Sequence, residues 1–222
     1  IGVAEPNRIA CAGWSYGGYL TMAVLACHPE LFVAGISICG MSDLGTFYRT
    51  TEPWIAAASY PEYGHPVADR ELLEALSPLQ RVQSMTAPLL VVHGAHDTNV
   101  PVSESEQIVE ALRAIGRTAR LLLFADDGHE ITRRENHTVL AGAVADWLHR
   151  VVAGLAPAAP GYHRLEIAPR PLPALDWAAT RHLTPYGEAR VAWRRDGGQV
   201  VISAHVPANA GAHVSLPDGR SF

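Results

Sequence analysis

Four short apolar runs divide the first part of the chain into strand-sized and helix-sized segments. The runs cover residues 8–13, 33–39, 89–94 and 119–125. Almost unbroken apolar runs of this length are typical of strands buried on both faces of a parallel sheet. Longer segments with helical spacing lie between them, as in βαβ units. The pattern predicts an α/β fold with about four parallel strands and helices on both faces.

Three of the intervening segments are predicted helices. Residues 16–27 contain small residues, among them Gly18, that allow a helix to lie close to the sheet. Residues 103–115 and 136–152 each carry an apolar stripe with the helical period. The stretch 45–69 reads as irregular and rich in aromatic residues.

The composition and the spacing of apolar residues change near residue 154. Residues 154–161 are rich in Pro and Ala and predict an extended linker. Short alternating segments separated by Pro, Gly and Asp follow, which is typical of antiparallel strands. Among them, 190–206 predicts a β-hairpin with its turn at Asp196-Gly197-Gly198. The predicted organisation is an α/β domain over 1–153, the linker, and a small antiparallel β domain over 162–222.

Gly13-Trp14-Ser15-Tyr16-Gly17 lies where the first predicted strand meets the first predicted helix. A G-x-S-x-G sequence in that position is typical of a nucleophile elbow, a strained turn that lifts a serine hydroxyl clear of the sheet edge. Glycine on either side is expected to leave room for the neighbouring backbone. The turn also directs the Tyr16 N–H toward the place where an acyl oxygen gathers negative charge. Ser15 is the candidate nucleophile, and the Tyr16 N–H is the candidate oxyanion-hole donor.

Two further candidates follow the last two apolar runs. Asp97 comes just after residues 89–94, and His129 comes after residues 119–125. The carboxyl ends of parallel strands share one edge of a sheet, and α/β-hydrolases use the order Ser, Asp, His. We therefore expect His129 to act as the general base for Ser15, and Asp97 to fix the imidazole tautomer.

Other polar residues compete for these roles. His93 and His96 are alternatives to His129 as the base, but their positions in the strand and the turn indicate that they shape the Asp97 loop. Asp126 and Asp127 are alternatives to Asp97, but they lie so near His129 in sequence that a solvated turn is expected. The remaining candidates are interpreted as surface, capping or loop residues, namely His28, His137 and Glu130.

Three strings together carry a resemblance to a known family. GWSYGGY, PLLVVHGAHDTNVPVSESEQIVEAL and LLLFADDGHEITRREN resemble the carboxyl-terminal catalytic half of prolyl oligopeptidase-type serine peptidases, over residues 1–152. The resemblance implies an α/β-hydrolase fold, serine acyl transfer, and a small peptide, acylated amino acid or ester as substrate. In that family the stretch corresponding to 45–69 borders the substrate pocket, and a packed surface loop is the alternative interpretation.

The resemblance also implies that part of the hydrolase sheet is missing. In the family, strands upstream of the nucleophile supply a second oxyanion donor, whereas only residues 1–7 precede the first run here. We therefore expect a truncated domain with impaired activity, because losing one such donor typically lowers the rate by about 10²- to 10³-fold. The apolar run at residues 9–12 is expected to form an uncovered edge, which is a candidate site for homo-oligomer formation.

The tail resembles a different family. APAAPGYHRLEIAPRP, TRHLTPYGEARVAWRRDGG and VPANAGAHVSLPDG resemble the carboxyl-terminal β-sandwich of bacterial α-L-rhamnosidases. That resemblance transfers no catalytic residue. Trp177, Tyr186 and Trp193 either offer aromatic faces to a sugar or fill the core. Two carboxyl-terminal pieces in one chain predict a chimeric or fused gene, so a non-catalytic remnant and a carbohydrate-associated module are the alternatives to a peptidase.

Composition narrows the choice of partners. The net charge is −5, and all 17 basic residues are Arg. No basic stripe of the kind that binds nucleic acid is present, and the acidic first part disfavours anionic membranes. The glycine loops lack nucleotide-binding spacing, so no cofactor is expected.

The number and spacing of the cysteines bear on the cellular location that we expect. Cys11, Cys27 and Cys39 are odd in number and lack metal-ligand spacing, so buried free thiols and no metal site are expected. The chain shows no leader and no apolar stretch of transmembrane length. A cytoplasmic location is the resulting prediction.

Overall fold

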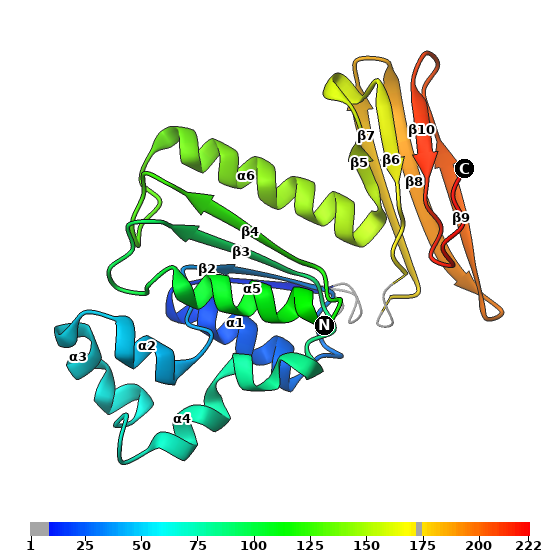
Figure 1. Ribbon diagram of the computed structural model, residues 1–222. Helices are drawn as coiled ribbons and strands as arrows, with labels where there is room; N and C mark the ends of the chain where they lie inside the picture. The colour runs from blue at the N-terminus through cyan, green and yellow to red at the C-terminus, as the bar shows by residue number, and fades with distance from the viewer. Residues whose placement is uncertain (1–8, 172–174) are drawn as a thin grey trace, which may run out of the picture. The chain divides into compact units, whose positions relative to one another are not determined.

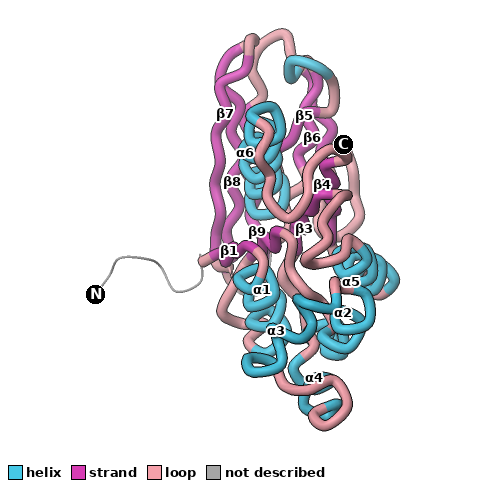
Figure 2. Tube along the Cα trace, turned by 90° about the vertical axis from the view of Figure 1, so that its left-hand side faces the viewer, coloured by secondary structure: helices cyan, strands magenta, loops and turns pink. Residues whose placement is uncertain are grey.

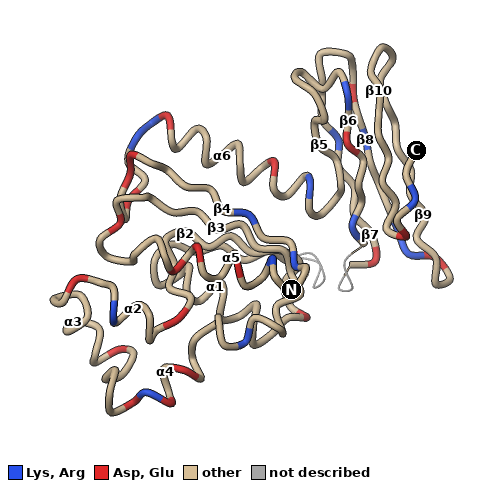
Figure 3. Tube along the Cα trace, in the orientation of Figure 1, with Lys and Arg blue, Asp and Glu red and all other residues tan. Residues whose placement is uncertain are grey.

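The computed structural model describes residues 9–171 and 175–222 (Figure 1). The described residues divide into two compact units, residues 9–140 and residues 141–222. Helix α6 (Arg134–Leu148) contains the boundary between them. Basic and acidic residues are interspersed along both units (Figure 3). In the described part of the chain, no helix has both the length and the apolar character to cross a bilayer.

A four-stranded parallel sheet forms the centre of the first unit, and its strand order is β1-β2-β3-β4. The predicted strands are confirmed within two residues at each end. All six residues of β3 are buried, as the unbroken apolar run predicted. Among the described residues, β1 pairs only with β2, so β1 is an edge strand here. The strands are β1 (Ala10–Trp14), β2 (Ala34–Ile38), β3 (Leu89–Gly94) and β4 (Ala119–Phe124).

Two predicted helices pack on this sheet, α1 (Tyr16–Cys27) and α5 (Ser103–Ala114) (Figure 2). Their apolar residues, including Met22 and Ile108, share one core cluster with Leu89 of β3. The close approach of α1 depends on Gly18, because a Cβ atom there would lie 2.8 Å from the Ile38 carbonyl oxygen. The sequence prediction of a small-residue contact at this helix is therefore confirmed.

The prediction of irregular structure over 45–69 is wrong. The chain forms α2 (Leu44–Thr50) and α3 (Pro53–Tyr63) there, then α4 (Arg70–Leu76) and the 3₁₀ segment η2 (Pro78–Ser84). Asp43 caps α2 by accepting the Thr46 N–H at 2.9 Å, and Pro53 begins α3, where its missing N–H costs nothing. These end signals stabilise helices whose sequences show no clear apolar period.

Two three-stranded sheets form the second unit, with strand orders β10-β6-β5 and β7-β8-β9. Leu165 and Ile167 of the first sheet share a core cluster with Ala189 and Val191 of the second, so the unit is a β-sandwich. The strands are β5 (Leu155–Pro157), β6 (Arg164–Ile167), β7 (Trp177–Thr184), β8 (Gly187–Asp196), β9 (Gln199–His205) and β10 (Gly211–Val214).

The predicted hairpin is confirmed, as β8 and β9 pair antiparallel around Gly197 and Gly198, which both have positive φ. Two other features differ from the sequence prediction. Residues 155–157 are not an extended spacer, because they form β5 and Leu155 is buried in the sandwich core. Strand β10 pairs parallel with β6, whereas an antiparallel domain was predicted.

Candidate active site

Ser15 lies at the sharp turn between β1 and α1, with φ 57° and ψ −115°. Its N–H donates to the Ile38 carbonyl oxygen at 2.7 Å, which ties the turn to β2. A Cβ atom at Gly13 would lie 2.1 Å from the Gly17 carbonyl oxygen, whereas a Cβ atom at Gly17 would meet nothing within 4 Å. The elbow therefore requires glycine at position 13 but not at position 17, which corrects the expectation for both flanks.

The structure brings the three sequence-predicted side chains together. His129 Nε2 lies 2.9 Å from Ser15 Oγ, and His129 Nδ1 lies 2.8 Å from Asp97 Oδ2. An ionised carboxylate only accepts hydrogen bonds, so Nδ1 carries a hydrogen and the neutral ring presents its Nε2 lone pair to the serine hydroxyl. This arrangement lets His129 remove the Ser15 proton while Asp97 stabilises the resulting imidazolium.

Asp97 is held by hydrogen bonds on both oxygens. Oδ1 accepts the backbone N–H groups of Asn99 and Val100, each at 2.9 Å, and Oδ2 faces His129 and, at 3.1 Å, His93 Nε2. Burial alone would raise the pKa of this carboxyl, but the contacts with His129 and His93 and the Val100 N–H outweigh burial and hold the pKa well below its usual range. Asp97 therefore remains ionised beside the imidazole.

The loop that carries His129 is anchored at two points. Trp14 Nε1–H donates to the His129 carbonyl oxygen at 3.0 Å and so links this loop to the elbow. Asp127 is 4% exposed and accepts hydrogen bonds from Thr132 and Asn136. Asp127 is thus buried, which corrects the expectation of a solvated turn, whereas Asp126 is exposed and pairs with a nearby arginine.

The competing histidines occupy other positions. His93 is fully buried and contacts Ser105 and the Val100 carbonyl oxygen, so it supports the Asp97 loop as expected, although its contact with Asp97 itself was not foreseen. His96 is exposed in the turn. His137 Nε2 bonds the Ile131 carbonyl oxygen. The exposed His28 lies 3.7 Å from Glu30, and Glu130 is an exposed loop residue.

Tyr16 begins helix α1, so its backbone N–H is among the first four amides, which have no acceptor within the helix. The Tyr16 ring stacks on Tyr63, with 5.5 Å between ring centroids. This contact connects the residue after Ser15 to the end of α3.

A cavity of about 350 Å³ opens beside Ser15 and His129. One face of α3 forms a wall of it, because its lining residues recur at helical spacing. Of the two interpretations of residues 45–69, the structure therefore supports a pocket border. The lining residues from α3 are Trp54, Ile55, Ala58, Ser59, Glu62 and Tyr63, and the other walls include Met41, Phe47 and Val100.

Glu104 is a second buried carboxylate, and the sequence pattern did not distinguish it, because it belongs to the polar face of an amphipathic helix. It is fully buried, and Oε2 accepts the backbone N–H groups of Ser42 and Asp43, each at 2.9 Å. Oε1 accepts the Thr46 hydroxyl. Burial raises the pKa of Glu104 despite these donors, because none of them is a cation. The carboxyl joins α5 to the start of α2.

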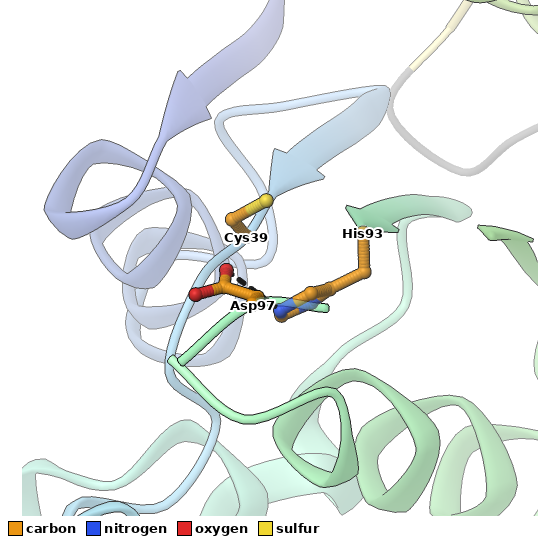
Figure 4. Close-up of side chains that lie close together, drawn as sticks. All are labelled: Cys39, His93 and Asp97. Atoms are coloured by element: carbon orange, nitrogen blue, oxygen red, sulfur yellow. Dashed lines mark ion pairs between the residues drawn. The ribbon is translucent and has the colours of Figure 1, made fainter. Parts of the chain in front are cut away.

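Cys39, His93 and Asp97 lie close together (Figure 4), each with one potential ligand atom within 4.8 Å of the others. They are poorly suited to a metal, because burial raises the pKa of the Cys39 thiol to about 12 and His93 Nε2 faces two oxygen acceptors. The prediction of buried thiols holds for Cys39 but is wrong for Cys27, which is exposed.

The second unit carries a separate hollow of about 400 Å³ on its β7-β8-β9 sheet. Trp177 lines it and is 41% exposed, and Arg194 and Ser203 contribute polar groups. Trp193 is 2% exposed, so it fills the core as one of the two interpretations predicted, whereas Tyr186 is 39% exposed.

Sequence comparison gives two matches along the chain. The sequence model of the prolyl oligopeptidase family matches residues 2–154, and that of the bacterial alpha-L-rhamnosidase C-terminal domain matches residues 154–221. Dipeptidyl aminopeptidase BIII of Pseudoxanthomonas mexicana is 34% identical over 160 residues, which are 70% of this chain and 23% of that protein. The acylamino-acid-releasing enzyme of Arabidopsis thaliana is 28% identical over 158 residues, 68% of this chain and 20% of that protein.

Solved structures agree with these matches. Acylaminoacyl peptidase of Pyrococcus horikoshii has a TM-score of 0.62 at 28% identity and covers 67% of this chain and 25% of its own. A puromycin-hydrolyzing peptidase of Mycobacterium tuberculosis has a TM-score of 0.65 at 26% identity, over 68% of this chain and 23% of its own. The chain thus spans about a fifth to a quarter of the length of these relatives. With an α/β-hydrolase sheet over the matched region, the chain belongs to the prolyl oligopeptidase family, and its tail matches a rhamnosidase C-terminal domain.

Proposed function

We propose that the first unit is a serine hydrolase that acts on short peptides or acylated amino acids by acyl transfer. The observation that carries the proposal is the continuous hydrogen-bonded chain from Ser15 Oγ through His129 to Asp97. Its three members come from loops at the carboxyl ends of β1, β3 and β4, so the sheet fixes their spacing.

The proposed reaction has two halves. Ser15 Oγ forms a bond to the substrate carbonyl carbon while its proton passes to His129 Nε2. The carbonyl oxygen becomes an oxyanion, and the Tyr16 N–H is the proposed donor to it. His129 then gives its proton to the leaving amine or alcohol, which departs and leaves an ester on Ser15. Water attacks that ester while His129 Nε2 takes its proton, and His129 returns this proton to Ser15 Oγ as the bond to the acyl group breaks and the acid departs.

The cavity supports the proposed substrate class. Its walls combine apolar side chains, such as Ile55, with polar ones, such as Ser59 and Glu62, so the cavity offers contacts both to an acyl group or side chain and to the polar atoms of a peptide. The names of the relatives include dipeptidyl and acylaminoacyl peptidases. N-acetyl amino acid p-nitroanilides and p-nitrophenyl esters are therefore suitable first substrates.

Labelling with a fluorophosphonate tests the proposal. We expect the wild-type chain to be labelled and Ser15→Ala to remain unlabelled, because the probe reacts with an activated serine. Ser59→Ala removes a different hydroxyl that lines the same cavity and is the matched control, which should label as the wild type does. Loss of p-nitrophenyl ester turnover in His129→Ala is the second expected result. Equal labelling of the wild type and Ser15→Ala would contradict the proposal.

The hollow beside Trp177 favours carbohydrate binding by the second unit as a second candidate function. Trp177, which is 41% exposed, lines this hollow together with Arg194 and Ser203, and an indole, a guanidinium and a hydroxyl are groups that contact sugar rings. Rhamnose should then raise the melting temperature of the wild type but not that of Trp177→Ala. Leu183→Ala removes another exposed apolar side chain of β7, outside the hollow, and should respond as the wild type does. An unchanged wild-type melting temperature in rhamnose contradicts this candidate.

A further inference from the structure

His93 occupies the one strand that is buried along its whole length in the first unit's described sheet, and its side chain is fully buried. Its Nε2 lies 2.8 Å from the Val100 carbonyl oxygen and 3.1 Å from Asp97 Oδ2. Figure 4 shows the ring directed at the Asp97 carboxylate. A carbonyl oxygen and an ionised carboxylate can only accept hydrogen bonds, so Nε2 must carry a hydrogen.

The other ring nitrogen has a different partner. Nδ1 lies 2.6 Å from the Ser105 hydroxyl, which is also fully buried and comes from α5. A hydroxyl can donate as well as accept, so this contact allows a ring protonated at Nε2 alone to accept the Ser105 hydrogen at Nδ1. The Val100 carbonyl oxygen and Asp97 thus select the tautomer of His93, and the Ser105 hydroxyl is the matching donor to Nδ1.

From this geometry we infer that His93 is a positioning residue for the proposed catalytic acid. It joins the Val100 carbonyl oxygen to Asp97 through one N–H group, and so fixes the loop between them in the orientation that meets His129. The kinetic part of this inference rests on the proposed hydrolase function, whereas the hydrogen-bond assignment does not.

The neutrality of His93 matters for the chemistry. Asp97 must keep its negative charge available to the imidazolium that forms on His129. A second cation at His93 would neutralise that charge. Cys39 also lies beside the pair, and its raised pKa keeps the thiol uncharged. Glu104, which precedes Ser105 in the sequence, is directed at Ser42 and Asp43. A neutral His93 orients Asp97 without opposing its charge.

Nitrogen-15 NMR of the imidazole rings tests the assignment in the intact chain without any turnover. We expect His93 at neutral pH to be neutral and protonated at Nε2, and His93→Gln identifies its signals by their loss. In Ser105→Ala the Nδ1 shift should move because its donor is gone. A doubly protonated ring, or a hydrogen on Nδ1 alone, would overturn the inference.

Kinetics test the positioning role. His93→Met removes the donor at similar side-chain size and should lower kcat about 10²-fold with little change in KM, because Asp97 and His129 are misplaced. His93→Gln can still donate from its amide and should keep kcat within about tenfold of the wild type. Without the donated bond, Asp97 attracts the His129 proton more strongly, so the acid limb of the pH–rate profile should move to higher pH in His93→Met.

Controls separate this role from a loss of folding. If His93→Met does not fold, Ser105→Ala should show the same two changes to a smaller degree, and Ser103→Ala, an exposed serine of the same helix, should show neither. Equal kinetics of the Met and Gln variants, or an unmoved acid limb in every variant, overturn the inference. If the wild type itself turns over nothing, the proposed function fails, and the NMR assignment alone decides on His93.

Discussion

The loop after β3 and the first turn of α5 each bury one carboxylate, Asp97 at 7% and Glu104 at 0% exposure. Their pKa values move in opposite directions, because that of Asp97 is lowered and that of Glu104 is raised. Both accept two backbone N–H groups near 2.9 Å, so main-chain donors do not account for the difference. The remaining hydrogen-bond partners do, together with the deeper burial of Glu104.

Asp97 faces two imidazoles, one of which becomes a cation when it takes a proton. Glu104 faces hydroxyls and the Gln107 amide, and its recorded hydrogen bonds include no ionisable group. The comparison teaches that burial alone does not set the state of a carboxyl. A nearby group that can carry positive charge keeps the Asp97 carboxyl ionised, whereas Glu104 joins α5 to the start of α2.

The largest expected effect comes from removing the charge of Asp97. Asp97→Asn keeps the size of the side chain but lets His129 adopt the wrong tautomer, so kcat for p-nitrophenyl ester hydrolysis should fall about 10⁴-fold. Asp126→Asn alters an exposed carboxylate near the His129 loop and should keep most of the activity. Similar losses in both variants would contradict the assigned role.

Glu104→Leu should act on stability first. It leaves the buried N–H groups of Ser42 and Asp43 without their acceptor, so the free energy of unfolding should fall by about 2–4 kcal/mol. Urea unfolding measures this, with Glu110→Leu as the matched loss of an exposed carboxylate on the same helix. Equal free energies of unfolding in the two variants would contradict a stabilising role for the Glu104 hydrogen bonds.

The opposite pKa shifts predict opposite dependences of stability on pH. The contribution of Glu104 is complete below the unfolded value of about 4.3 and is lost as pH rises through its raised pKa. That of Asp97 is present above about 3.9 and is lost as pH falls through its lowered pKa. The free energy of unfolding should be measured as a function of pH. Its decrease with rising pH should be absent in Glu104→Gln, and its decrease with falling pH should be absent in Asp97→Asn. Retention of either trend in its variant contradicts the assignment.

Ser42→Ala should give the smallest effect. The Ser42 hydroxyl lies 3.2 Å from Glu104 Oε2 and 2.6 Å from the Glu104 carbonyl oxygen. Its loss should lower the free energy of unfolding by about 1 kcal/mol and leave the acid limb of the pH–rate profile unchanged. Ser84→Ala, at an exposed serine, is the control for thermal and urea unfolding. A shifted acid limb would mean that the two carboxylates are coupled.

Local sequence patterns were sufficient to predict much of the fold. The four apolar runs predicted β1 to β4, and the Gly197-Gly198 turn predicted the hairpin, because burial on both faces and positive φ leave signals within a few residues. The helices over 44–63 were missed, because their stability depends on the Asp43 cap and on packing of aromatic side chains rather than on an apolar period. The position of β5 was missed because Leu155 is buried by residues far along the chain.

The sequence by itself determined which residues stand at the carboxyl ends of the strands, and so it identified Ser15, Asp97 and His129 as the candidate site. Only the tertiary structure decided which donors surround each carboxylate. The Ser42–Glu104 bonds join residues 62 positions apart, and the Asp97–His129 bond joins residues 32 apart. Sequence patterns report on neighbours along the chain, whereas the charge of a buried group is set by neighbours in space.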